Sequence, residues 1–184
     1  MTALLRFPKP YADTVARLRV PGGFLILAVF AWLAHPTVRS LEMGAPVSLL
    51  GLLLRGWAAG CLAKNRQLAI GGPYAYTRNP LYIGTLLVAA GLVLAARSYA
   101  LAALTAAVFL LIYLPVIELE EQHLRVLFPE YPAYAARVPM LIPRFGGASQ
   151  KNTHPFRWAR YLRNEEYQAG VAFIAGMLFL FWKL

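Results

Sequence analysis

Two polar stretches interrupt an otherwise apolar chain, and their side chains suit ligands of opposite charge. The first, residues 71–84, has the sequence GGPYAYTRNPLYIG and places Arg78 directly before Asn79 and Pro80. Asn favours the N-cap of a helix and Pro its first position, so a helix should begin there. Free backbone N–H groups and the positive end of the helix dipole would then lie beside Arg78. Such a place suits a carboxylate or a similar anion.

The second stretch, residues 118–124, has the sequence ELEEQHL and follows an apolar run. Its three carboxylates are costly beside hydrocarbon unless they are solvated or paired. On a helix, Glu118 and Glu121 share one face and Glu120 points away from them. They could form a solvated helix end, with Glu121 and Arg125 as an ion pair, or accept hydrogen bonds from a cationic ligand.

Common catalytic signatures do not occur in this sequence. It has no serine–histidine–aspartate pattern, no glycine-rich dinucleotide fingerprint and no group of residues that suggests a metal site. The single cysteine, Cys61, excludes an internal disulfide and a cysteine-based zinc site. A doubly wound nucleotide-binding fold is therefore not expected.

The composition indicates an integral membrane protein. Hydrophobic residues make up 59% of the 184 residues and charged residues only 14%, against about 25% charged residues in soluble domains. The net charge of +10 could suggest nucleic acid as a partner. The charges lie between apolar runs rather than on one solvated face, so they fit membrane topology and contact with anionic lipids better.

We expect an all-α polytopic membrane protein with about five transmembrane helices and a cytoplasmic amphipathic segment. Runs of about 17–20 apolar residues suit a hydrocarbon core of about 30 Å. Pro46 is expected to open the second run, which Arg55 interrupts, and the short link at Arg97 and Ser98 forces the third and fourth runs into an antiparallel hairpin. The five runs are residues 21–34, 46–63, 80–96, 99–117 and 168–184.

The positive charges predict the orientation in the membrane. With the N-terminus in the cytoplasm, the inside segments hold fourteen of the 18 Lys and Arg residues and the outside segments hold three. This asymmetry supports the orientation, because cytoplasmic loops carry an excess of Lys and Arg. It places both polar stretches on the cytoplasmic side. The inside segments are residues 1–19, 64–78 and 118–167.

The chain divides at a glycine- and serine-containing stretch. Residues 146–152 have the sequence GGASQKN, which is typical of a linker. We therefore expect a membrane core in residues 1–145. Residues 146–184 would add the linker, a basic aromatic amphipathic segment and a C-terminal transmembrane helix.

Together the two polar stretches form a two-part motif. The run G-P-Y-x-Y-x-R-N-P-x-Y-x-G is followed by E-E-x-x-L-x-x-x-F-x-x-Y-x-x-Y. This order and spacing resemble the isoprenylcysteine carboxyl methyltransferase family and the related phospholipid N-methyltransferases. The resemblance covers residues 50–143. It implies a small integral membrane enzyme that uses S-adenosylmethionine and acts on a lipophilic acceptor.

The resemblance also implies which residues contact the cofactor. Glu120, the first glutamate of the pair, would accept hydrogen bonds from the ammonium or the ribose. Tyr74 and Tyr82 could contact adenine or the sulfonium, or could instead be interfacial anchors. Arg78 could pair with the cofactor carboxylate or with Glu120, or mark the membrane boundary. The implied contacts are Gln67, Leu68, Tyr74, Arg78, Asn79, Pro80, Leu81, Tyr82 and Glu120.

At two positions the sequence departs from the prenylcysteine enzymes. Asn79 stands where those enzymes have histidine, and asparagine cannot act as a general base near neutral pH. Val116 stands where they have an arginine associated with the substrate carboxylate. Both departures count against a prenylcysteine carboxylate as the acceptor, and neither removes a cofactor residue.

The identity of the acceptor stays open at this stage. Arg55, Glu118 and Glu121 are the candidate acceptor-binding residues, although Arg55 could equally form a structural ion pair. A lipid amine, a thiol and a carboxylate are all compatible, and a phospholipid N-methyltransferase is the nearest alternative. In an amine-specific enzyme, Glu118 or Glu121 could accept the proton. A non-catalytic membrane scaffold or lipid-binding protein is the alternative of another class.

Overall fold

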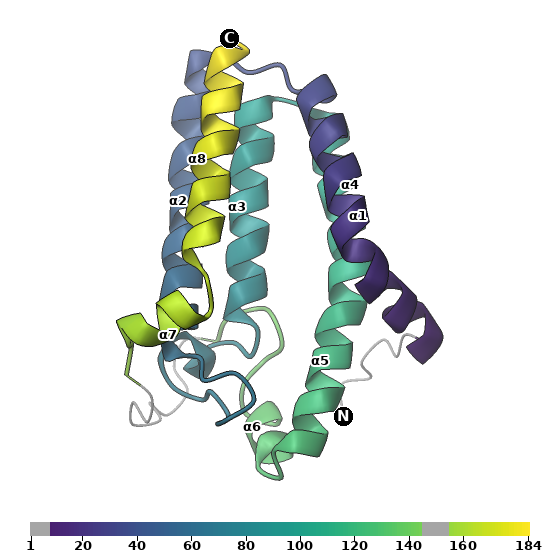
Figure 1. Ribbon diagram of the computed structural model, residues 1–184, viewed down its shortest axis with the longest axis vertical. Coiled ribbons are helices and arrows are strands. Elements are labelled where there is room, and N and C mark those ends of the chain that lie inside the picture. The colour runs from purple at the N-terminus through teal and green to yellow at the C-terminus, as the bar shows by residue number, and fades with distance from the viewer. Residues whose placement is uncertain (1–7, 145–154) are drawn as a thin grey trace.

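In the computed structural model, residues 8–144 and 155–184 are described, and within these every regular element is a helix. The all-α prediction is therefore confirmed for this part of the chain. The long helices run side by side (Figure 1). The predicted linker at residues 146–152 lies outside the described residues.

The first two long helices both begin earlier than the sequence predicts. Helix α1 spans Lys9–Leu33. It can begin this early because Pro10 falls in its first turn, where proline is tolerated. Helix α2 spans Val38–Cys61, and Pro46 lies inside it rather than at its start. A capping box sets that start: Thr37 Oγ1 accepts the Ser40 N–H at 3.2 Å, and Ser40 Oγ accepts the Thr37 N–H at 2.9 Å.

Helices α2 and α3, which spans Pro80–Ala96, pack with their backbones in contact. Glycines make this possible: a Cβ at Gly51 would lie 2.6 Å from the carbonyl oxygen of Gly84, and a Cβ at Gly91 would lie 2.5 Å from that of Gly44. The Ser48 hydroxyl donates to the Val88 carbonyl at 3.0 Å across the same interface. Small residues of this kind drive close helix association in membranes.

We expect Gly91→Ala to lower the free energy of unfolding by about 1–3 kcal/mol, because the new methyl group overlaps the α2 backbone. Thermal unfolding in detergent measures the loss. Gly176→Ala in the C-terminal helix is the matched control, since its Cβ would lie an ordinary 3.6 Å from Leu92. Equal melting temperatures for the two variants would contradict this account of the interface.

The fourth long helix is continuous through residue 127 and contains a π-helical segment. It consists of α4 (Tyr99–Val108), the π segment η2 (Phe109–Tyr113) and α5 (Leu114–Leu127). It passes the end predicted at residue 117, because residues 114–127 form a strongly amphipathic helix. Pro115 cannot donate to the Leu111 carbonyl, and Tyr11 of α1 donates to that carbonyl at 2.7 Å instead.

The remaining elements complete the two ends of the helices. Helix α3 runs antiparallel to α4–α5 through the short link at Arg97, as predicted. Helix α8 (Tyr167–Trp182) packs on α2 and α3, and the short helices η1 (Gly72–Ala75), α6 (Tyr131–Ala135) and α7 (Trp158–Arg163) complete the set. Helices α6 and α7 lie at one end of the molecule, together with the loop that precedes α3 (Figure 1).

Two of the described helices are long and apolar enough to cross a membrane, judged by length and composition: Val38–Cys61 and Tyr99–Leu127. Helices α3 and α8 are apolar but shorter. Five membrane spans and the cytoplasmic position of the amphipathic segment stay predictions.

Candidate functional site

The two halves of the motif meet where α3 begins and α5 ends. The Tyr82 hydroxyl, in the first turn of α3, donates to the Glu120 carboxylate at 2.8 Å. The Glu120 side chain is exposed, so one carboxylate is presented to the surroundings at the edge of an apolar helix pair. The sequence motif therefore corresponds to one place in the fold.

Beneath this contact lies a buried ion pair. Arg78 Nε lies 3.1 Å from Glu121 Oε1, and the two side chains are only 8% and 4% exposed. The sequence suggested Glu120 as a partner of Arg78, but the structure pairs Arg78 with Glu121, the second glutamate of the pair. Glu121 does not pair with Arg125, whose guanidinium lies 5.8 Å from the centre of the Tyr131 ring.

Asn79 occupies the N-cap position of α3, but its side chain makes no capping hydrogen bond. The expectation that it caps the helix through its side chain is wrong. The Asn79 amide instead donates to Glu121 Oε1 and to the Met140 carbonyl, each at 3.1 Å. It therefore ties the start of α3 both to α5 and to the segment after α6.

The segment after α6 binds along the loop before α3. The Tyr134 hydroxyl donates to the Tyr74 carbonyl at 2.7 Å, and the Arg78 N–H donates to the Pro139 carbonyl at 2.9 Å. The Thr77 hydroxyl donates to the Met140 carbonyl at 3.1 Å. These bonds explain why tyrosines and prolines follow the glutamate pair: they hold residues 74–79 in one conformation.

The sequence interpretation missed Tyr113, which ends the π segment. Its ring packs edge-on against Tyr82 with the centroids 5.9 Å apart. A π segment changes the direction in which the following side chains point and is frequent at functional sites. Pro115 in the middle of an apolar run was the available signal, because proline there disturbs the regular hydrogen bonds of a helix.

Tyr74 has a buried hydroxyl that makes no hydrogen bond within the described residues. Burial raises the pKa of this phenol far above its usual range, and neighbouring groups, among them Glu120 and Glu166, raise the pKa further. The hydroxyl is therefore a neutral donor and acceptor. A buried polar group without a partner is costly, so a bound ligand is a natural partner for it.

The side chains of the other predicted cofactor residues differ in how far they are exposed. Gln67 is exposed in the loop, whereas Leu68 is buried against Tyr131 and Tyr134. Pro80 is fully buried, and Leu81 packs beside the cluster that contains Tyr74. The buried side chains shape the site.

Of the three candidate acceptor-binding residues, Glu121 lies within this network, paired with Arg78. Glu118 is half-buried on α5, one turn before Glu121. Arg55 forms a two-point ion pair with Glu166, with Nε–Oε1 and Nη2–Oε2 distances of 2.5 and 3.0 Å, and also donates to Thr85. The sequence offered no sign of this partner, which lies 111 residues away.

The groups at this place fit S-adenosylmethionine. Glu120 could accept hydrogen bonds from the ribose hydroxyls or the ammonium and complement the sulfonium. The unpaired Tyr74 hydroxyl could take a further polar group. The tyrosine rings at positions 82 and 113 offer faces and edges for adenine or for a cation.

Tyr74→Phe separates a binding role from a structural one. We expect unchanged or slightly higher stability, because the variant removes a buried hydroxyl that has no hydrogen-bond partner. We expect affinity for S-adenosylmethionine to fall about fivefold to tenfold, the value of about one neutral hydrogen bond. Calorimetry measures the affinity and thermal unfolding the stability. Lower stability with unchanged affinity would make Tyr74 a structural residue.

Comparison with known proteins decides the family. The family model described as "Phospholipid methyltransferase" matches residues 47–131, which include the Tyr82–Glu120 contact and the Arg78–Glu121 pair. The chain belongs to the family of isoprenylcysteine carboxyl methyltransferases and phospholipid methyltransferases. The short helix α7 and helix α8 lie outside the matched part of this methyltransferase family.

Two curated relatives carry names that refer to metal resistance. The chain is 32% identical to the cobalt-zinc-cadmium resistance protein CzcN of Cupriavidus metallidurans, over 79% of this chain and 69% of that protein. It is 30% identical to the nickel-cobalt-cadmium resistance protein NccN of Alcaligenes xylosoxydans xylosoxydans, over 72% and 62%. No solved structure matches the chain. Within residues 8–144 and 155–184, no group of three or more His, Cys, Asp or Glu side chains could hold a metal ion.

Proposed function

We propose that this protein is a membrane-embedded S-adenosylmethionine-dependent methyltransferase that acts on a lipophilic acceptor. Membership of the family supports methyl transfer. The observation that carries the proposal is the Tyr82–Glu120 contact. It joins the entrance of one apolar helix to the polar end of its antiparallel partner, so a water-soluble donor could meet a membrane-borne acceptor there.

Methyl transfer requires the protein to position the reactants and does not require a catalytic dyad. When bound, the cofactor supplies an activated methyl group on a sulfonium with a good leaving group. The chain would hold donor and nucleophile in line and exclude water. Glu120, Tyr74 and Tyr82 would hold the cofactor. The buried Arg78–Glu121 pair and Asn79 would fix the backbone that carries them.

Among acceptors we favour the amine of a phospholipid over a prenylcysteine carboxylate. Val116 is buried where the prenylcysteine enzymes have an arginine, and Arg55 is already neutralised by Glu166. Neither position offers a cation to a carboxylate substrate. Glu118 and Glu121 share one face of α5, and either carboxylate could accept the proton of an amine.

We place the site on the cytoplasmic side, with the N-terminus also in the cytoplasm. The excess of Lys and Arg in the segments at that end supports this orientation. The cofactor would then enter from the cytoplasm, and the acceptor from the bilayer.

A second candidate is a lipid-binding component of a metal-resistance system that has kept the methyltransferase scaffold. The names of the two relatives favour it. The two functions differ in cofactor binding: the enzyme should bind S-adenosylmethionine and its demethylated product saturably, whereas the non-enzyme should show no signal at millimolar cofactor.

The deciding experiment incubates the purified protein with radiolabelled methyl donor and a total lipid extract, followed by separation of the lipids. We expect label in a lipid amine, and much less label when Glu120→Ala replaces the wild type at a donor concentration below saturation. Label in a carboxyl ester would correct the acceptor class. No labelled lipid, together with no cofactor binding by a folded sample, would reject the enzyme in favour of the second candidate.

A further inference from the structure

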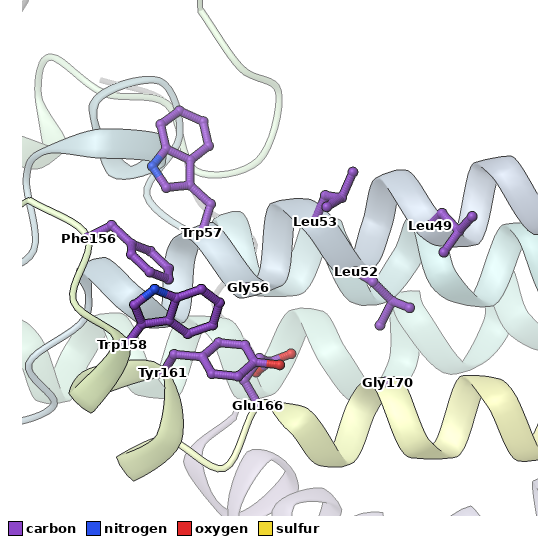
Figure 2. Close-up of a pocket in the computed structure, with 10 residues that line it drawn as sticks. All are labelled: Leu49, Leu52, Leu53, Gly56, Trp57, Phe156, Trp158, Tyr161, Glu166 and Gly170. Atoms are coloured by element: carbon purple, nitrogen blue, oxygen red, sulfur yellow. The ribbon is translucent and has the colours of Figure 1, made fainter.

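A cavity of about 450 Å³ lies where α2 meets α7 and α8 (Figure 2). None of its lining residues belongs to the site at residues 74–82 and 113–121. Two of the three helices that form it fall outside the matched part of the methyltransferase family. The feature is therefore separate from the proposed methyl-transfer site.

One part of the groove is an apolar wall. Leu49, Leu52 and Leu53 line the groove from little more than one turn of α2, and Leu49 and Leu53 are exposed. Leu52 points toward Gly170 of α8 (Figure 2), which lines the groove without a side chain, and a Cβ at Gly170 would meet nothing within 4 Å. An open, aliphatic groove of this kind suits an acyl chain.

The other end of the groove is aromatic. Phe156, Trp158 and Tyr161 pack edge-to-face, with neighbouring centroids 5.1 and 5.5 Å apart. The Phe156 ring lies directly on Gly60, where a Cβ would overlap it. Asn164 donates to carbonyls at the end of α2, at 2.9 and 3.2 Å, so that α7 is fixed across that end. Aromatic side chains at the end of a span typically lie at the level of lipid head groups.

The charges at the aromatic end favour an anion. Glu166 lines the groove, but Arg55 neutralises it. Arg157 is exposed directly before Trp158, and Arg160 donates to the carbonyl of Cys61 at 3.4 Å. Arg163 is exposed on the face of α7 opposite to Trp158 and Tyr161. The remaining acidic side chain of this segment, Glu165, is exposed and accepts a hydrogen bond from Gln168. Arginines therefore exceed carboxylates around this end.

We propose that this groove is a binding site for an acidic phospholipid. The acyl chain lies along the leucines of α2 beside Gly170, and the phosphate lies near Arg157. The order of the groups carries the inference. Along the groove an apolar wall is followed by aromatic rings and then by an arginine, which is the order of acyl chain, interfacial region and head group in a lipid. Basic residues near a membrane surface attract anionic lipids.

Native mass spectrometry of the detergent-purified full chain tests the proposal, with phosphatidylglycerol and phosphatidylcholine of identical acyl chains as probes. We expect the wild type to keep one phosphatidylglycerol at least fivefold more often than one phosphatidylcholine. Gly170→Leu places a side chain in the groove at a position where a Cβ meets nothing within 4 Å, and it should lower the phosphatidylglycerol adduct at least tenfold. Gly23→Leu is the matched control, because a Cβ at Gly23 of α1 also meets nothing within 4 Å, and it should keep the adduct.

A second variant tests the head-group end and does not depend on the folding of the first. Arg157→Gln should remove the preference for phosphatidylglycerol while some lipid still binds, whereas Arg163→Gln, on the opposite face of α7, should keep that preference. The proposal is overturned if wild type and Gly170→Leu carry equal adducts, or if the wild type binds both lipids equally. A dimer that Gly170→Leu converts to monomer would assign the groove to a second copy of the chain. Methylated lipid as the retained species would assign it to the acceptor.

Discussion

Glu120→Ala is expected to lower the affinity for S-adenosylmethionine by about 10- to 100-fold, the value of about 1.5–3 kcal/mol for a hydrogen bond to a charged group. The Glu120 side chain is exposed and is held in place by the Tyr82 hydroxyl at 2.8 Å. The substitution removes the carboxylate and leaves the buried Arg78–Glu121 pair intact. Calorimetry on detergent-purified protein measures the affinity, and thermal unfolding should show almost no change.

The charge of the ligand sharpens this test. If Glu120 complements the sulfonium, Glu120→Ala should weaken the binding of S-adenosylmethionine more than the binding of its demethylated product, because the product has lost that positive charge. Glu130→Ala is the matched control, because it removes the same side chain from an exposed position at the start of α6. Equal affinities of the wild type and both variants would show that the cofactor does not bind at Glu120.

The sequence predicts the meeting of the two motif halves because each half follows a helix boundary. Residues 79–80 begin one apolar helix and the glutamates end the apolar part of its antiparallel neighbour, so a short link between the helices must bring them to the same end. Connectivity alone thus predicts that the two halves share one end of the helix pair. The contact between Tyr82 and Glu120 is a finding of the structure.

The partner of Arg78 could not be predicted in the same way. Glu120 and Glu121 point about 100° apart on a helix, so the rotation of α5 about its own axis decides which one faces the loop. That rotation depends on the π segment and on the packing of α1 against α5. Sequence distance also hides the Arg55–Glu166 pair, because nothing local relates α2 to the start of α8.

The predicted start of the second helix was wrong because Pro46 was taken as its first position. Pro46 lies within α2, since the capping box at Thr37 had already begun that helix. The long helix continues through Pro115, and Tyr11 of α1 satisfies the carbonyl that this proline leaves free. This second contact comes from elsewhere in the chain, and a local pattern cannot show it.

Glu121→Leu is expected to lower the free energy of unfolding by about 3–5 kcal/mol, because it leaves the buried guanidinium of Arg78 without its counter-charge. The side chains of both residues are less than a tenth exposed, so water cannot replace the lost carboxylate. Asn79 also loses its acceptor at 3.1 Å, and the start of α3 is no longer joined to α5 through this bond. Thermal unfolding in detergent measures the loss.

The double variant Arg78→Met with Glu121→Leu decides whether the unpaired charge is the cause. Replacing a buried ion pair by apolar residues is often nearly neutral, so the double variant should regain most of the stability that Glu121→Leu loses. Cofactor affinity should stay low in both, because Tyr82 depends on the position of the α3 start. If the double variant is as unstable as the single one, the buried pair is not what holds the two motif halves together.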